Sequence, residues 1–139
     1  MRGVRGATTV SRNDAGEIAE RTRELIQLLM DANGVRPQDI ASALFTVTAD
    51  LDAQFPAVAA RGLADWRDVP LLCAREIPVP RSLGNCIRVL IHWNTDRPQR
   101  EVRHVFLRGA RRLRPEWAVR VPGDEEEEMI RVTPPEPPR

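Results

Sequence analysis

Residues 86–93 constrain the fold more than any other part of the chain, because their side chains alternate between two chemical types. Every second position from Ile87 to Trp93 is apolar, as in one face of a β-strand. Arg88 lies in the middle of the opposite face. Arginine is always charged and rarely buried without a partner. The strand therefore either exposes Arg88 to water on a two-sided sheet or presents it to an anion.

Size and composition limit the functions that need to be considered. A chain of 139 residues forms one domain, and a net charge of +1 argues against binding nucleic acid by bulk electrostatics. All 21 basic residues are arginine, which excludes Schiff-base chemistry from a lysine. Cys73 and Cys86 provide neither a disulfide framework nor metal-ligand spacing, so we expect no metal site.

The N-terminal residues 1–5 carry no signal-peptide core, and no apolar run approaches the length of a membrane span. We therefore expect a soluble, cytoplasmic protein.

Hydrophobic periodicity predicts alternating strands and helices. A strand at 2–10 precedes N-cap candidates at 11–14 and an amphipathic helix that Asn33-Gly34 ends. Further strands are expected at 40–48, 69–76, 86–93 and 102–107, with a short helix over about 55–63. This order predicts an α/β or α+β fold with a mixed sheet of about five strands and helices on one face.

The chain changes composition near its C-terminus. Residues 1–121 form the predicted domain, whereas residues 122–139 are acidic and proline-rich. Such a segment lacks the apolar surface to order itself alone, so we expect a flexible tail.

Common catalytic signatures are missing from the sequence. There is no phosphate-binding glycine loop and no GxSxG motif, and His92 and His104 are too few for a metal site or a triad. What remains is a set of arginines near strand ends, with Glu76 at the end of the third strand and Cys73 beside it.

Five blocks occur in one order and spacing: Arg5–Val10, Phe55–Ala57 with Arg61, Val69-Pro70 with Cys73 and Glu76, Cys86–Val89, and Arg103–Val105 through Leu113–Pro115. This set closely resembles the monofunctional, trimeric α/β class of chorismate mutase, the AroH type, over about residues 2–117. The resemblance implies a homotrimeric pseudo-barrel with active sites between subunits. It also implies chorismate as the substrate, with no nucleic acid or membrane partner.

The implied reaction is the pericyclic rearrangement of chorismate to prephenate in phenylalanine and tyrosine biosynthesis. It needs no covalent intermediate, proton shuttle or cofactor, and so we expect none. The substrate is a dicarboxylate with a hydroxyl group, and its transition state gathers negative charge on the breaking ether oxygen. A suitable site is rich in arginine and has one acceptor for the hydroxyl.

The resemblance assigns roles position by position. Arg88 would donate to the ether oxygen, Arg5 would pair with a carboxylate, and Glu76 would accept from the ring hydroxyl. The expected substrate-binding residues around these three are Phe55, Ala57, Arg61, Cys73, Leu72, Phe106, Leu113 and Arg114. One subunit would supply the Arg88 side and its neighbour the Phe55 and Arg61 side.

Two positions depart from the family pattern. Phe106 stands where a tyrosine hydroxyl usually meets a substrate carboxylate, so we expect weaker substrate binding. Leu72 replaces a commonly polar residue near the hydroxyl end. In addition, strict alternation puts Cys73 and Glu76 on opposite faces. For both to line one pocket, the strand must bulge or end near Ala74-Arg75.

Two other functions compete with this hypothesis. The segment 97–114 is strongly basic, as in an RNA- or anion-binding module, but Phe106 is its only aromatic residue. The alternative on the same scaffold is a catalytically impaired interaction domain, since a fold does not determine a function.

Overall fold

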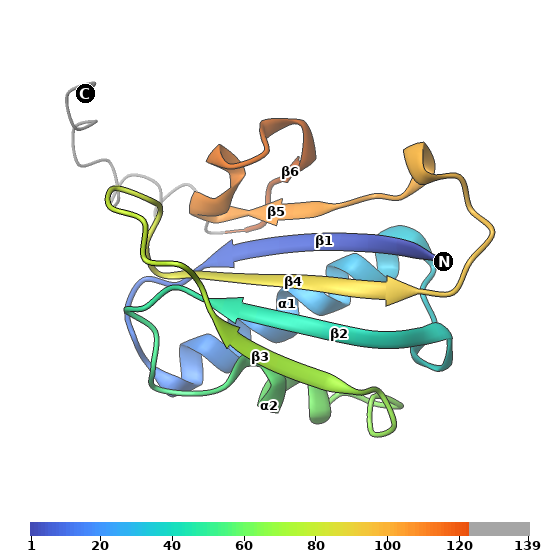
Figure 1. The fold of residues 1–139 in the computed structure, drawn as a ribbon, viewed down its shortest axis with the longest axis horizontal. Coiled ribbons are helices and arrows are strands. Elements are labelled where there is room, and N and C mark those ends of the chain that lie inside the picture. Colours follow the sequence, from blue (N-terminus) through green and yellow to red (C-terminus); the bar gives the residue numbers. More distant parts are fainter. Residues whose placement is uncertain (123–139) are drawn as a thin grey trace.

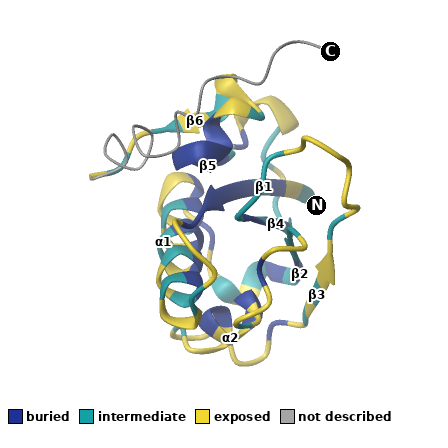
Figure 2. Ribbon diagram, turned by 90° about the vertical axis from the view of Figure 1, so that its left-hand side faces the viewer, coloured by how far each residue is buried: buried dark blue, intermediate teal, exposed yellow. Residues whose placement is uncertain are grey.

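The computed structural model describes residues 1–122, which form a six-stranded sheet with helices on one face (Figures 1 and 2). The strands are β1 (Arg2–Thr9), β2 (Ile40–Val47), β3 (Leu71–Arg75), β4 (Cys86–Trp93), β5 (Val105–Leu107) and β6 (Ala118–Val119). The α-helices are α1 (Ala15–Asn33) and α2 (Pro56–Arg61). Short 3₁₀ helices lie at η1 (Pro37–Asp39), η2 (Gln99–Glu101), η3 (Arg108–Arg112) and η4 (Pro115–Trp117).

The long helix α1 begins and ends at the residues that the sequence indicates. The Asp14 side chain accepts a hydrogen bond from the Glu17 N–H, which satisfies one of the unpaired donors of the first turn. Gly34 follows the last turn with φ 68°, a left-handed conformation that glycine adopts without a steric cost. Both predicted boundaries are confirmed.

The strand order is β3-β2-β4-β1-β5-β6, so β4 lies inside the sheet between two antiparallel neighbours. The other pairings, β2 with β3, β1 with β5 and β5 with β6, are parallel. The mixed α/β sheet expected from the sequence is thus confirmed.

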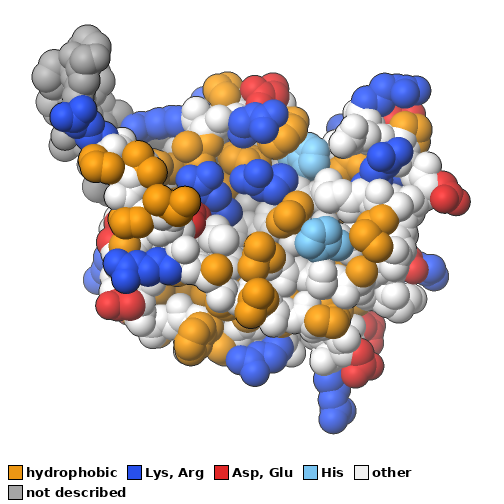
Figure 3. Space-filling view, viewed as in Figure 1, with side chains coloured by type: hydrophobic (Ala, Val, Ile, Leu, Met, Phe, Trp, Pro, Cys, Tyr) orange, Lys and Arg blue, Asp and Glu red, His pale blue; other side chains and the backbone are white. Residues whose placement is uncertain are grey.

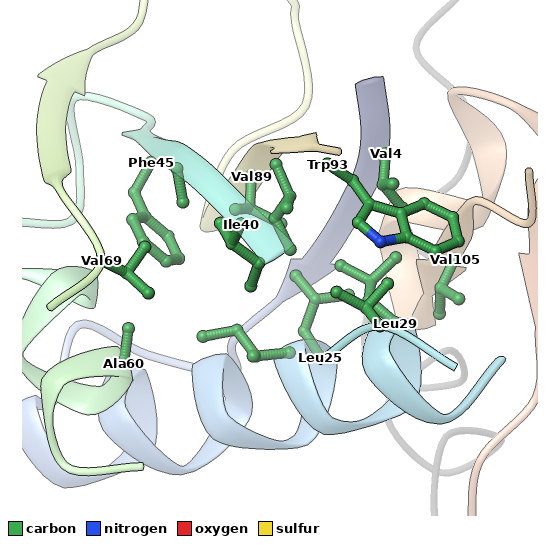
Figure 4. Packing of buried hydrophobic residues seen from close by; sticks show 14 of the residues in the cluster. Val4, Leu25, Leu29, Ile40, Phe45, Ala60, Val69, Val89, Trp93 and Val105 are labelled. Atoms are coloured by element: carbon green, nitrogen blue, oxygen red, sulfur yellow. The ribbon is translucent and has the colours of Figure 1, made fainter. Parts of the chain in front are cut away.

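The main core lies between the sheet and the two helices (Figure 4). Leu25 and Leu29 of α1 pack under Phe45 and Val89, and all four are almost completely buried. Val89 pairs with Phe45 on β2 and with Gly6 on β1. The odd-numbered residues of β4, such as Val89, therefore face the helices, whereas Arg88 lies on the opposite face of the sheet.

Two strands are shorter than predicted by more than one residue, and one strand was missed. The strand expected at 69–76 covers only Leu71–Arg75, and the strand expected at 102–107 covers only Val105–Leu107. The two-residue strand β6 exists because Ala118 and Val119 pair with β5. Such a pairing between distant segments leaves no periodic pattern in so short a stretch. Almost all of the predicted tail, residues 123–139, lies outside the described residues.

The region after β5 is fastened to α1 by an ion pair between the buried Arg108 and the partly exposed Glu24. Arg108 is 1% exposed with φ 52°, and its Nη2 donates to both carboxylate oxygens of Glu24 at 2.9 and 3.0 Å. The Gly109 N–H donates to Thr9 Oγ1, which joins the same turn to the end of β1. These contacts set the direction in which residues 113–117 return to the sheet.

Gly6 is required by the packing of α1 against β1. A Cβ at this position would lie 2.7 Å from Leu29 Cδ1 and 3.1 Å from Leu25 Cδ1, both on fully buried side chains. We expect Gly6→Ala to lower the free energy of unfolding in urea by about 1–3 kcal/mol. Gly3→Ala is the matched control, because its Cβ meets only Leu90 at 3.3 Å and Gly3 is exposed. Equal stability of the two variants would contradict this account.

Candidate active site

Arg88 lies on the sheet face that the helices leave open, paired across the strands with Ala7 and Thr46. Figure 3 views this face and shows arginine side chains among apolar residues and both histidines. The Arg88 side chain is 30% exposed. Its role is therefore not simply that of a solvated charge on a polar surface.

Glu76 provides the negative charge next to Arg88. It follows the last residue of β3, and its N–H donates to Val47 O at 2.9 Å, which holds the backbone at the sheet edge. Glu76 Oε2 lies 3.1 Å from Arg88 Nε and accepts a hydrogen bond from Thr46 Oγ1 at 2.7 Å. The orientation of Arg88 Nε does not meet hydrogen-bond geometry, so this pair is electrostatic. The carboxylate is thus held in place mainly by Thr46.

Arg5 lies on β1 beside Arg88. Burial lowers the pKa of Arg5 from its ordinary value, and the positive charges of Arg88 and Arg114 lower it further, while Glu76 opposes them. Three guanidinium groups therefore share one region with the Glu76 carboxylate. Such an excess of positive charge on a partly buried surface favours an anionic ligand.

Arg114 and Leu113 reach this region from the 3₁₀ helices that follow β5. The Arg114 Cζ lies 3.6 Å from the centre of the Trp117 ring, and its Nε donates to Glu116. That bond is the main reason why the pKa of Glu116 is lowered. Leu113 packs against a small cluster on the open face that contains Ala7 and Phe106.

Phe106 is completely buried, with the Trp117 ring centroid 5.6 Å away and the Arg5 guanidinium 5.8 Å from its centre. Its ring therefore supports Arg5 and Trp117, and its surface is closed to a ligand. This burial differs from the expectation, drawn from the sequence, that Phe106 contacts the substrate.

A second group of predicted residues lies at the other edge of the sheet, around a cavity of about 480 Å³. Its lining includes Phe55, Ala57, Arg61, Leu72 and Cys73. Phe55 and Leu72 are each 66% exposed, which is unusual for large apolar side chains.

Within one chain, Cys73 and Glu76 do not share a pocket. Cys73 pairs with Phe45 and packs against the helix-side core, so it faces away from Arg88. For both residues to line one pocket, the strand had to bulge or end near Ala74-Arg75. The strand β3 does end at Arg75, and its ladder with β2 runs to that residue without a bulge. Ending the strand still leaves Glu76 on the open face and Cys73 on the other.

Three residues near the charges are not among the site residues predicted from the sequence: Thr46, Trp117 and His104. Thr46 is identified only by strand register, because it is opposite Arg88 on β2. His104 Nδ1 accepts the Arg5 backbone N–H at 2.9 Å, and its ring centroid is 4.0 Å from that of Trp117. Neither contact has a signal in the sequence.

Two of the arginines in the basic segment 97–114 are buried. Arg108 is paired with Glu24, and Arg111 Nε donates to Arg108 O. The segment therefore does not present a continuous cationic surface, which weakens the RNA-binding alternative. Within residues 1–122 no helix is long and apolar enough to cross a membrane, and no cluster of ligating side chains fits a metal ion.

Comparisons with known proteins agree on one family. Residues 1–117 match the family model described as chorismate mutase type I. The chain is 53% identical over 117 residues to chorismate mutase AroH of Thermus thermophilus, covering 84% of this chain and 95% of the relative. It is 42% identical over 119 residues to chorismate mutase AroH of Bacillus subtilis, covering 86% and 94%. A solved chorismate mutase from Clostridium thermocellum superposes with a TM-score of 0.76 at 50% identity, covering 78% of this chain and 96% of that one.

The environment of His104 predicts a pH dependence of stability. Burial lowers the pKa of His104, and the charges of Arg5 and Arg114 lower it further. The folded state then binds fewer protons at His104 than the unfolded state. The free energy of unfolding should therefore fall as the pH decreases below about 6.5, the ordinary histidine value.

Urea unfolding measured between about pH 7.5 and pH 5, the range in which histidine side chains titrate, checks this expectation. His104→Asn keeps an acceptor for the Arg5 N–H but does not titrate, so the difference between its curve and that of the wild type isolates His104. Parallel curves would show that His104 does not contribute.

Proposed function

The chain belongs to the chorismate mutase type I family and is a chorismate mutase, an isomerase that acts on chorismate, and we propose that Arg88, Glu76 and Arg5 carry its reaction. The observation behind this proposal is the Arg88–Glu76 pair on the open sheet face, with Arg5 beside it. The conversion of chorismate to prephenate belongs to aromatic amino acid biosynthesis, and we assign it to the cytoplasm.

Arg88 stabilises the charge that develops during the rearrangement. As the ether bond of chorismate breaks, negative charge grows on its oxygen, and a guanidinium fixed on an inner strand can donate to it without moving. The pairing of β4 with β1 and β2 along its length keeps the Arg88 backbone in place. Preorganisation of this kind lowers the barrier because no reorganisation is required in the transition state.

Glu76 accepts a hydrogen bond from the ring hydroxyl of the substrate. Thr46 donates to Oε2 of this carboxylate, and Arg88 lies on the same side. This arrangement orients the carboxylate beside a positive charge. The enzyme thereby selects the conformer in which the reacting ends of the substrate meet.

Arg5 and Arg114 bind the substrate carboxylates, and Leu113 closes the site beside them. The shared positive charge of the three guanidinium groups supports this assignment, since a dianionic ligand relieves their mutual repulsion. With Phe106 in the place of the family's tyrosine, one donor to a carboxylate is missing, and binding is weaker for that reason.

The site is completed by a neighbouring subunit of a homotrimer. Phe55, Ala57, Arg61, Leu72 and Cys73 surround a separate cavity at the β3 edge of the sheet, and β2 lies between that edge and the strand β4 that carries Arg88. The exposed Phe55 and Leu72 are suited to burial against a second copy. We assign this second wall of the pocket to the adjacent subunit.

Arg88→Ala should lower kcat/KM for chorismate by about 10²–10³-fold or more, since it removes the donor to the ether oxygen. The measurement is the loss of chorismate absorbance with purified protein. Arg100→Ala, at an exposed position in η2, is the matched control and should retain wild-type activity. An inactive wild type would instead support the impaired interaction domain, and an active Arg88→Ala would exclude Arg88 from the site.

A mixture of two inactive variants tests the shared site. If Arg88 and Arg61 of one site come from different subunits, co-refolded Arg88→Ala and Arg61→Ala chains should form some intact sites, roughly a quarter of the total. Activity should then exceed that of either variant alone. No recovery, with trimers present by light scattering, would place both arginines of a site on one subunit.

A further inference from the structure

Trp117 contacts two side chains at the basic end of the proposed site. Its ring centroid is 4.0 Å from that of His104, with the two rings tilted by 45°, and the Arg114 Cζ lies 3.6 Å from the centre of the Trp117 ring. The contact with Arg114 is within the range of a cation–π interaction. Trp117 is half-buried, and neither of these contacts involves Arg5 or Arg88.

Local structure brings Trp117 and Arg114 together. The 3₁₀ helix η4 begins at Pro115, and the Trp117 N–H donates to Arg114 O at 2.9 Å. Residues three apart in such a turn lie above one another, so the indole covers the guanidinium. The contact is therefore built into the backbone of this turn.

The position of Arg114 requires support because its charge is near two others. The charges of Arg88 and Arg114 both act on Arg5, and this repulsion disfavours any conformation that brings Arg114 close. The Trp117 ring face and the Glu116 carboxylate are the groups that offset it.

His104 connects the Trp117 ring to the Arg5 backbone. Its Nδ1 accepts the Arg5 N–H at 2.9 Å, in the place where a backbone carbonyl would continue the β1–β5 ladder. The neutral ring carries its proton on Nε2 when Nδ1 accepts. His104 thus ties the strand that carries Arg5 to the ring that carries Arg114.

Resting on the proposed function, we propose that Trp117 is a positioning residue whose ring, backed by His104, holds the Arg114 guanidinium beside Arg5, where a substrate carboxylate binds. Trp117 itself does not contact the substrate. Its effect is on binding and not on the bond-breaking step, which depends on Arg88.

Trp117→Leu should raise KM for chorismate about three- to tenfold, the change expected from losing an arginine–aromatic contact. The value of kcat should stay near that of the wild type. Partial unfolding has the opposite signature, since it lowers apparent kcat and leaves KM unchanged. Trp117→Phe, which keeps a ring face, is the matched control and should show a smaller rise. An unchanged KM in Trp117→Leu overturns the proposal.

A double-mutant cycle with Arg114→Ala separates this inference from the proposed function. If Trp117 acts through Arg114, adding Trp117→Leu to Arg114→Ala should not raise KM further. Additive effects would overturn the positioning role. If Arg114→Ala alone leaves KM unchanged, the assignment of Arg114 to carboxylate binding fails, whatever Trp117 does.

Tryptophan fluorescence of the wild-type protein, compared with that of Trp117→Phe, provides a readout that does not rely on kinetics. Trp66 and Trp93 are buried in the core, so the fluorescence that Trp117→Phe removes belongs to the Trp117 ring. Adding the product prephenate should change that component, because the Arg114 guanidinium reorients toward the carboxylate. A response equal to that of Trp117→Phe would contradict the proposal.

Discussion

The pairing of β4 with neighbours on both sides is the constraint on which the rest of the molecule depends. It directs Val89 and Ile91 into the helix-side core, where α1 covers them, and it leaves Arg88 on the uncovered face. One strand therefore contributes to folding with half of its side chains and to chemistry with the other half. Because the alternation has a period of two, the two roles cannot be separated by a shift in register.

The electrostatics of the open face follow from this arrangement. Burial and the positive charges of Arg88 and Arg114 lower the pKa of Arg5, and Glu76 opposes this effect only in part. Their positions are secured by contacts outside the charged group: Thr46 on Glu76, His104 on the Arg5 backbone, and Trp117 on Arg114. In the proposed site the groups that act on the substrate are charges, and these neighbouring contacts hold the charges in place.

Sequence patterns were sufficient for the parts of the fold that repeat locally. The helix from Asp14 to Gly34 has an N-cap, an apolar stripe and a terminating glycine, each readable within a few residues. The spacing of Arg5, Glu76 and Arg88 among the five matching blocks was also sufficient to identify the family. By contrast, β6 and the shortened β3 and β5 depend on pairing partners far away in the chain, and no local pattern announces where such pairing ends.

The sequence by itself determined which residues are available for the reaction. The arginines, the glutamate and the alternation of side chains along a strand all follow directly from the order of the residues. Tertiary structure decided how they are grouped. It buried Phe106 completely and brought Thr46, His104 and Trp117 to the charges. The physical reason is that side-chain neighbours across a sheet are set by strand register and by the path of the returning chain, and both are properties of the folded molecule.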